Sequence, residues 1–487
     1  MVAGKPNILF ICTDQQRYDA LGCYGNTHSQ TPVIDALAGE GVLFEQCYVQ
    51  SPVCAPSRAS LVTGQYPSVH GLWGNGVALP HHAAIFSRAL ADGGYDCGTI
   101  GKMHLAACFN GRTEPRPADD GFGFYRWAHD PSHSSPENAY HRWLGEHHPT
   151  LLDEARAGGP RVRHAAAGFD TMPTEAHYSR WAADTAIEFL AGEREDDAPF
   201  FLWVNFYDPH HPFVAPQEYL DRFDPDDLPD PIGFPGELDT KPEIQRQASA
   251  ESYAGHARGF STHDASEIKR IIAAYYAMVS LVDDEVGRIL ACLDAQGLGE
   301  DTLVIFTSDH GEMLGDHQLL LKGPMLYEPA VRVPLIMRWP GRLPEGERRV
   351  GLVQWLDLNP TFLDAAGLDP LPGSQGQSLL PLARGDTDVE GRGWAICEYL
   401  NSGHPYDPPV FLTMLRHDRY KLIVEHGPPA TTRSRTGELY NLETDPTELC
   451  NLWDDPASVG IRIDLERMLL DVMVATHDRS QPREAFW

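Results

Sequence analysis

The chain has 487 residues, 42% of them hydrophobic, and a formal net charge of −31 at pH 7. This length accommodates a large core and more than one compact domain, and the sequence contains no run of 18 or more apolar residues that could span a membrane. The negative charge repels nucleic acid and anionic membranes, so a site for a small anion must supply its own positive charge. The first residues lack the layout of a secretory signal, and we therefore expect a cytoplasmic protein.

Short apolar runs alternate with helical patterns along the chain. In chain order, these patterns predict a strand at 8–12, a helix at 31–39, a strand at 42–44, helices at about 56–61 and 83–91, and a strand at 95–100. The alternation returns with a helix at 178–192, a strand at 200–206, a helix at about 266–293 and a strand at 302–306. This succession is typical of an α/β fold with a large, mostly parallel sheet sandwiched by helices.

Three stretches depart from this alternation. Residues 106–173 and 216–263 are irregular, and we expect them to be insertions over the mouth of the sheet. After about residue 372, the pattern predicts short strands at 394–399, 411–415 and 420–423, followed by a helix at about 461–475. We therefore predict a large α/β domain over 1–372 and a small C-terminal α+β subdomain, with an antiparallel sheet and a helix, over 373–487.

Cys54 differs from the other eight cysteines in its surroundings. No two cysteines have the CxxC spacing of a zinc ribbon or a thioredoxin, and most are expected to be reduced and buried. In the stretch Cys54-Ala55-Pro56-Ser57-Arg58, the cysteine precedes a predicted helix N-terminus, which favours an anion. Arg58 lies one turn further and can donate to an oxyanion. Taken alone, the motif is also compatible with a buried, purely structural cysteine.

Other reactive side chains follow the ends of predicted strands. Asp14 follows the first strand, and Asp309 with His310 follows the strand at 302–306. Ligands of open α/β sheets bind at the carboxyl ends of the strands, so these three side chains predict a divalent metal site. A helix N-cap is the alternative role for Asp309, and a surface turn for Lys102. The further candidates at or shortly after strand ends are Lys102, His104, His210 and Lys322.

Taken together, these motifs resemble the sulfatase branch of the alkaline phosphatase superfamily. The resemblance covers nearly the whole chain, and it implies the alkaline phosphatase-like fold and hydrolysis of sulfate monoesters. The motifs that carry it are residues 6–14, 21–25, 31–32, 54–58, 61–64, 101–104, 307–312, 314–317, 438–442, 445–446 and 448.

The resemblance also implies roles for individual residues. Cys54 would be converted to formylglycine by a formylglycine-generating enzyme, and the hydrated aldehyde would be the nucleophile. The implied metal ligands are modified Cys54, Asp14, Asp309 and His310. The implied contacts to the nucleophile, the sulfate and the leaving group come from Arg58, Lys102, His104, His210, Lys322 and Asn75, with His210 protonating the leaving oxygen.

Two positions depart from the usual pattern of the family. Gln15 follows Asp14, where paired aspartates are usual, and His310 stands where many members have asparagine. The site thereby loses a negative charge and gains a nitrogen ligand. Calcium prefers oxygen ligands, so manganese is a second candidate beside the calcium that the family implies.

Two other functions are compatible with these residues. The Asp309-His310 pair and the stretch 200–214 also resemble phosphonate monoester hydrolases, which cleave phosphodiesters on the same scaffold. Lys102 and His104, in contrast, are typical of sulfatases. A metal-binding but catalytically silent relative is the third hypothesis, and the full set of candidate residues argues against it.

The substrate is expected to be a small sulfate, phosphate or phosphonate ester, with no nucleic acid or membrane partner. Four residues of the first insertion could line a pocket, although each is more often an ordinary loop residue: Trp127, His129, His133 and His141. The chain ends in two aromatic residues at 486–487, and we expect this tail to dock on a second subunit of a homo-oligomer.

Overall fold

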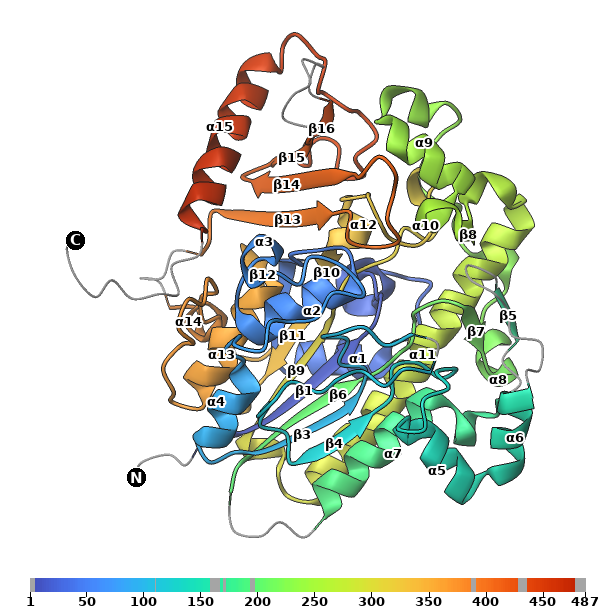
Figure 1. The fold of residues 1–487 in the computed structure, drawn as a ribbon, viewed down its shortest axis with the longest axis vertical. Coiled ribbons are helices and arrows are strands. Elements are labelled where there is room, and N and C mark those ends of the chain that lie inside the picture. The colour runs from blue at the N-terminus through green and yellow to red at the C-terminus, as the bar shows by residue number, and fades with distance from the viewer. Residues whose placement is uncertain are drawn as a thin grey trace, which may run out of the picture.

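A computed structural model describes residues 5–109, 111–157, 167–169, 172–192, 198–386, 391–427 and 436–477 (Figure 1). The aromatic tail at 486–487 lies outside these residues. Within the described part, no helix is both long and apolar enough to cross a membrane.

A large mixed sheet forms the centre of the molecule (Figure 1). Its strands lie in the order β10-β2-β11-β9-β1-β6-β3-β4, and β12 also pairs with β2. The strand bounds are β1 Asn7–Thr13, β2 Val42–Tyr48, β3 Asp96–Gly101, β4 Phe124–Trp127, β6 Phe200–Asn205, β9 Thr302–Ser308, β10 Arg332–Val333, β11 Leu335–Arg338 and β12 Glu347–Gln354.

The middle of this sheet is parallel. Strand β1 pairs in parallel with β6 on one side and β9 on the other, and β3 pairs in parallel with β6 and β4. Antiparallel pairing occurs where β11 and β10 meet β9 and β2. The carboxyl ends of β9, β1, β6 and β3 therefore lie side by side at one edge, and the predicted mostly parallel sheet is confirmed.

Helices cover both faces of the sheet. Because side chains alternate along a strand, Phe10 points into one core with α2, α4 and α13, whereas Ile11 points into the other core with α1, α7 and α11. These helices are α1 Pro32–Gly39, α2 Cys54–Thr63, α4 Phe86–Asp92, α7 Tyr178–Ala191, α11 Ala265–Ala295 and α13 Leu358–Ala365. The predicted sandwich of helices around the sheet is confirmed.

The C-terminal part contains an antiparallel four-stranded sheet in the order β13-β14-β15-β16, and α15 packs against it (Figure 1). The bounds are β13 Trp394–Leu400, β14 Phe411–His417, β15 Tyr420–Glu425, β16 Gly437–Asn441 and α15 Val459–Ala475. The sequence pattern predicted the first three strands and the helix, but it did not show β16 as a strand.

The two irregular stretches contain short elements. A two-stranded parallel pair, β5 Ala167–Phe169 with β7 Phe213–Ala215, joins the first stretch to the segment that precedes the second. The two stretches also contain α5 Ala139–His147, α6 Pro149–Ala157, α8 Gln217–Leu220, α9 Glu243–Ala250, α10 Ser252–Gly255 and β8 Ala257–Arg258. Outside them lie the short helices α3 Pro67–His70, α12 Glu328–Val331 and α14 Leu380–Arg384.

One element boundary at the edge of the site differs from the prediction, whereas the end of β3 agrees with it to within one residue. Helix α2 begins at Cys54 and not near Pro56, because proline is tolerated in the first turn of a helix, where no partner for its nitrogen is needed. Strand β3, predicted at 95–100, ends at Gly101, whose φ of 91° ends the extended conformation. A Cβ there would lie 2.2 Å from the backbone oxygen of Asn205, so only glycine fits.

Candidate active site

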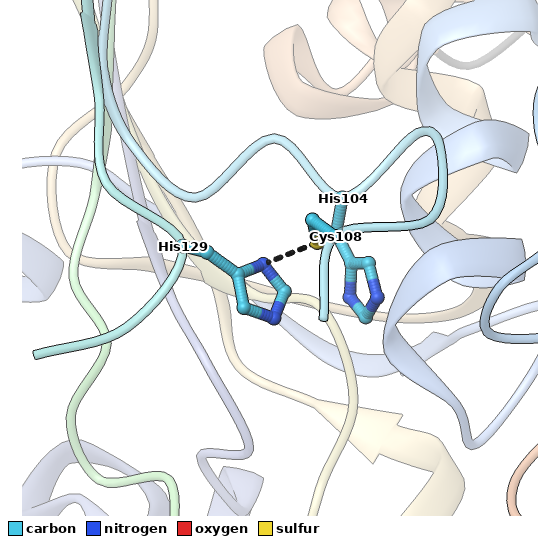
Figure 2. A group of neighbouring side chains, drawn as sticks. All are labelled: His104, Cys108 and His129. Atoms are coloured by element: carbon cyan, nitrogen blue, oxygen red, sulfur yellow. Dashed lines mark hydrogen bonds between the residues drawn. The ribbon is translucent and has the colours of Figure 1, made fainter. Parts of the chain in front are cut away.

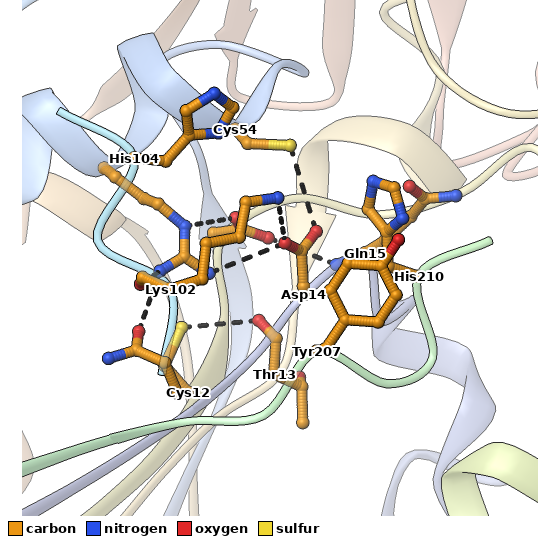
Figure 3. Close-up of polar contacts among 12 residues, drawn as sticks. Cys12, Thr13, Asp14, Gln15, Cys54, Lys102, His104, Tyr207 and His210 are labelled. Carbon is orange, nitrogen blue, oxygen red and sulfur yellow. Dashed lines mark hydrogen bonds and ion pairs between the residues drawn. The ribbon is translucent and has the colours of Figure 1, made fainter. Parts of the chain in front are cut away.

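The ends of four neighbouring strands supply most of the candidate residues. Asp14 follows β1, Lys102 follows β3, Asp309 follows β9, and His210 lies five residues beyond the end of β6. Because these strands are parallel and adjacent, the four side chains converge at one edge of the sheet. Figure 3 shows three of them, Asp14, Lys102 and His210. The strand order thus accounts for the convergence.

Cys54 enters this edge from the first position of α2. It is buried, and Val53, which precedes it, provides no side-chain cap to the helix. Instead, Oδ1 of Asn75 accepts a hydrogen bond from the Ala55 backbone N–H at 3.2 Å. The amide group of Asn75 therefore lies next to the helix N-terminus, where the dipole favours an anion.

Four buried side chains present ligand atoms to one point: Asp14, Cys54, Asp309 and His310. These atoms all lie within 4.8 Å of one another. His310 Nε2 is 3.0 Å from Cys54 Sγ and 3.6 Å from an oxygen of each aspartate. His310 Nδ1 donates to the Gly311 carbonyl at 2.9 Å, so Nε2 is the ring nitrogen available to a metal ion.

Arg58 connects this cluster to the sheet. Its Nε donates to Asp309 Oδ2 at 2.7 Å, and its Nη1 donates to the Lys102 carbonyl and to Asn205 Oδ1. Nη2 is buried, has no hydrogen-bond partner among the described residues, and lies 3.8 Å from Asp14 Oδ2. A buried guanidinium nitrogen without an acceptor is costly. Arg58 is thus poised to bind an anionic oxygen at this point.

Two lysines increase the positive charge of the site. Lys102 Nζ lies 2.6 Å from Asp14 Oδ2, and Lys322 Nζ donates to Gln15 Oε1. Burial alone would raise the pKa of the Asp14 carboxyl, but Lys102, Lys322 and Arg58 hold it well below its usual range. The carboxylate is therefore ionised, as a metal ligand must be. These cations provide the local positive pocket that a chain of net charge −31 needs for an anionic ester.

Two histidines flank the cluster. His104 is buried at a φ of 58°, a strained conformation for a residue with a Cβ, and its Nδ1 has no hydrogen-bond partner in the described part of the chain. His210 Nδ1 donates to the His211 carbonyl at 2.6 Å, which leaves Nε2 as the ring nitrogen for a substrate. Burial lowers the pKa of both imidazoles, and nearby cations lower it further.

Comparison with known proteins identifies the scaffold. The family model described as Sulfatase matches residues 6–368, and the model for the C-terminal part of N-sulphoglucosamine sulphohydrolase matches residues 315–475. The chain belongs to the sulfatase family. This sulfatase is 32% identical to the uncharacterized sulfatase YidJ of Escherichia coli (strain K12), over 97% of this chain and 88% of that one. It is 30% identical to the arylsulfatase of Clostridium perfringens (strain 13 / Type A), over 92% of this chain and 90% of the other.

A solved structure is also similar to this sulfatase. The phosphonate monoester hydrolase of Agrobacterium radiobacter superposes with a TM-score of 0.83 at 29% identity, covering 98% of this chain and 97% of that chain. Relatives of both kinds are hydrolases that act on esters, and the sulfatase is accordingly a hydrolase.

Sulfatases in general use a divalent metal ion and a formylglycine. The residues of this sulfatase fit both groups. Asp14, Asp309 and His310 offer two carboxylates and one ring nitrogen around the Cys54 side chain. Arg58 Nη2, which has no acceptor among the described residues, lies 3.8 Å from Asp14 Oδ2 and suits an additional oxygen on residue 54.

Four residues of the site were not among the predicted site residues: Gln15, Asn205, His211 and Glu312. Gln15 does not turn its amide toward the metal ligands: its Nε2 donates to Glu312 and lies 3.3 Å from His211 Nδ1. Asn205 holds Arg58. Asn205 carried a usable signal, because it is a polar residue at the carboxyl end of an apolar strand, like Asp14. Glu312 lies within the motif 307–312 and His211 follows His210, but neither carried a further signal of its role in the site.

Proposed function

We propose that this sulfatase hydrolyses sulfate monoesters with a nucleophile made from Cys54. One observation supports this proposal most strongly. The Cys54 sulfur and the ligand atoms of three other buried side chains all lie within 4.8 Å of one another. Burial and Asp14 would raise the pKa of the Cys54 thiol, but the nearby cations Lys102 and Lys322 lower it. A group that bears an oxyanion is stabilised at such a position.

The residues around Cys54 suit the separate tasks of this reaction. A hydrated formylglycine at position 54 would supply one hydroxyl as nucleophile toward sulfur and a second whose deprotonation releases sulfate. Asp14, Asp309 and His310 would hold a divalent ion, which lowers the pKa of the attacking hydroxyl and stabilises the sulfate oxygens. Arg58 Nη2 would bind the nucleophile oxygen.

The substrate contacts follow from the same geometry. Lys102 and Lys322 would neutralise the nonbridging sulfate oxygens, and the exposed amide of Asn75 would donate to them from the N-terminus of α2. His210 would deliver a proton from Nε2 to the leaving oxygen, since its Nδ1 is fixed by the His211 carbonyl. His104 would take up the proton that is lost when the sulfate departs.

The metal and the maturation step are part of the proposal. The nitrogen ligand His310 favours manganese over calcium, because calcium prefers an all-oxygen shell. Cys54 is buried at a helix N-terminus, and we propose that a formylglycine-generating enzyme oxidises it before the chain folds.

Phosphonate monoester cleavage is the second candidate function. It is favoured by the Asp309-His310 pair and by the similarity to the phosphonate monoester hydrolase of Agrobacterium radiobacter. Two other residues favour sulfate ester hydrolysis, because they are typical of sulfatases: His104 and Lys102. Lys102 is held in the site by its ion pair with Asp14, at 2.6 Å.

The test compares 4-nitrophenyl sulfate with 4-nitrophenyl phenylphosphonate. Both esters release 4-nitrophenol, so the need for His210 to protonate the leaving oxygen is the same for both. We expect a higher kcat/KM for the sulfate, and we expect the Cys54→Ala variant to lose activity on both esters. A higher kcat/KM for the phosphonate would reverse the order of the two candidates. Undiminished activity of Cys54→Ala would overturn both.

A further inference from the structure

A second group of metal-ligating side chains lies beside the active site. His104, Cys108 and His129 each offer one ligand atom, and these atoms lie within 4.8 Å of one another (Figure 2). Cys108 Sγ is 3.1 Å from His129 Nδ1, and the rings of His104 and His129 meet edge to face with their centroids 4.7 Å apart. The loop after β3 supplies the first two residues and the segment after β4 supplies the third. We call this group the thiol–imidazole trio.

The surrounding polar contacts fix the backbone on both sides of the trio. The buried Glu114 carboxylate accepts hydrogen bonds from the His104 backbone N–H at 3.0 Å and from Trp127 Nε1 at 2.9 Å. His133 Nε2 donates to the Cys108 carbonyl at 3.0 Å, while its Nδ1 accepts from the backbone N–H of Ser135. The trio is thus held together by its own framework before any ligand arrives.

The trio contains an unsatisfied buried atom. His104 is only 8% exposed, and its Nδ1 has no hydrogen-bond partner among the described residues. Burial, with Lys102 nearby, lowers the pKa of both His104 and His129, so the two rings are neutral at pH 7. Neutral imidazole is the form that binds a metal ion. Burial raises the pKa of the Cys108 thiol, and an incoming metal ion displaces that proton.

The two clusters differ in their donor atoms. The Asp14 cluster is rich in oxygen, whereas the trio offers one sulfur and two nitrogens. Thiolate with imidazole selects zinc-like ions over manganese or calcium. Two imidazoles and one thiolate leave the fourth position of a tetrahedral ion open for water. The next residue, Phe109, is 64% exposed, so this loop reaches the protein surface.

We propose that His104, Cys108 and His129 bind one zinc-class ion and that this ion inhibits turnover by occupying His104. Inhibition rests on the function proposed above, because there His104 takes a proton in the release of sulfate. Binding of the ion does not rest on it. The trio would make the enzyme sensitive to free zinc without disturbing the ion held by Asp14 and Asp309.

Cobalt tests the binding directly. In the Cys54→Ala variant, Cys108 is the thiol expected to ligate Co²⁺, and a cobalt–thiolate bond gives a near-ultraviolet charge-transfer band. We expect this band to saturate at one equivalent per chain, to vanish when Cys108→Ser is added, and to be displaced by Zn²⁺. The matched control adds Cys450→Ser, which removes an exposed thiol and should leave the band intact.

The His129→Gln variant provides a second check that keeps the thiol. It removes a ligand, so it should weaken cobalt binding by at least the roughly 10- to 100-fold that loss of an outer-shell partner causes, and it should alter the band. Absence of a band, or a band that survives Cys108→Ser, would overturn the proposal. This readout needs no turnover, so it stands apart from the test of the proposed function.

Zinc inhibition of the manganese-loaded wild-type enzyme tests the consequence. We expect Cys108→Ser to raise the inhibitory zinc concentration about 10- to 100-fold, with activity in the absence of zinc retained and with Cys450→Ser unchanged. Equal zinc sensitivity of the wild type and Cys108→Ser would show that inhibition does not act through the trio.

Discussion

Replacing Asn205 with leucine should disable the site without touching a residue that reacts. Asn205 is fully buried at the end of β6. Its Oδ1 accepts from Arg58 Nη1 at 2.7 Å, and its Nδ2 donates to the Ile100 carbonyl at 3.2 Å. Leucine has nearly the same shape but offers neither group. The change therefore removes one charge-assisted hydrogen bond and one neutral hydrogen bond, and it leaves a carbonyl without its donor.

The size of the effect follows from these two bonds. A hydrogen bond to a charged group contributes about 1.5–3 kcal/mol, and a neutral one about 0.5–1.5 kcal/mol. Together the two bonds contribute about 2–4.5 kcal/mol, and a large domain loses roughly 2–4 °C per kcal/mol, so we expect the apparent melting temperature to fall by about 4–18 °C. If the bond to Arg58 serves mainly to aim Nη2 at the nucleophile, its loss lowers kcat by about 10- to 100-fold.

Steady-state kinetics on 4-nitrophenyl sulfate, together with thermal melts, separate the two effects. The control is Asn205→Asp, which keeps an acceptor facing Arg58 and loses only the donor to Ile100. It should retain much more activity than Asn205→Leu. A folded Asn205→Leu protein with the kcat of the wild type would refute the positioning role that we assign to Asn205.

Three further changes should have measurable effects. His310→Asn should restore an oxygen-rich ligand set and shift the metal preference from Mn²⁺ toward Ca²⁺ in competition measurements; an unchanged preference would contradict the role of this nitrogen. Burial and the Lys322 cation lower the pKa of His210 from its usual 6.5, so kcat/KM for alkyl sulfates should fall as pH rises, with a midpoint below 6.5. His210→Gln should abolish this fall of kcat/KM with rising pH. If the fall persists in this variant, another group donates the proton. Burial raises the pKa of Asp283 from 3.8 to about 7, so the folded state favours the protonated form and stability should decline between pH 3.8 and 7. Melting curves of Asp283→Asn should show less of this decline, and an identical pH dependence would count against Asp283 as its source.

The edge of the sheet that carries the site could be predicted from local sequence. Asp14, Lys102 and Asp309 each come directly after an apolar run, and parallel strands end at the same edge. Those two facts place the three side chains at the same edge of the sheet, and the strand order then brings them close together. Helix α11 could also be predicted from local sequence, because its apolar residues recur at intervals of three or four residues.

Contacts made by side chains from distant parts of the chain could not be predicted in this way. The amide of Gln15 meets Glu312 and Lys322, which lie about 300 residues further along, and only the pairing of β1 with β9 brings them near. The thiol–imidazole trio depends on how the loop after β3 folds back against the segment after β4. Loop paths follow from tertiary packing, and periodicity carries no information about them.

The central claim is that Cys54 becomes the nucleophile, and the mass of the peptide that carries it tests this claim most directly. Conversion to formylglycine replaces sulfur by oxygen with loss of two hydrogens, a decrease of about 18 Da, whereas ordinary cysteine oxidation increases the mass. We predict this decrease in active protein from its native host, together with loss of activity in Cys54→Ala. An active protein whose Cys54 is an unmodified thiol would contradict the account.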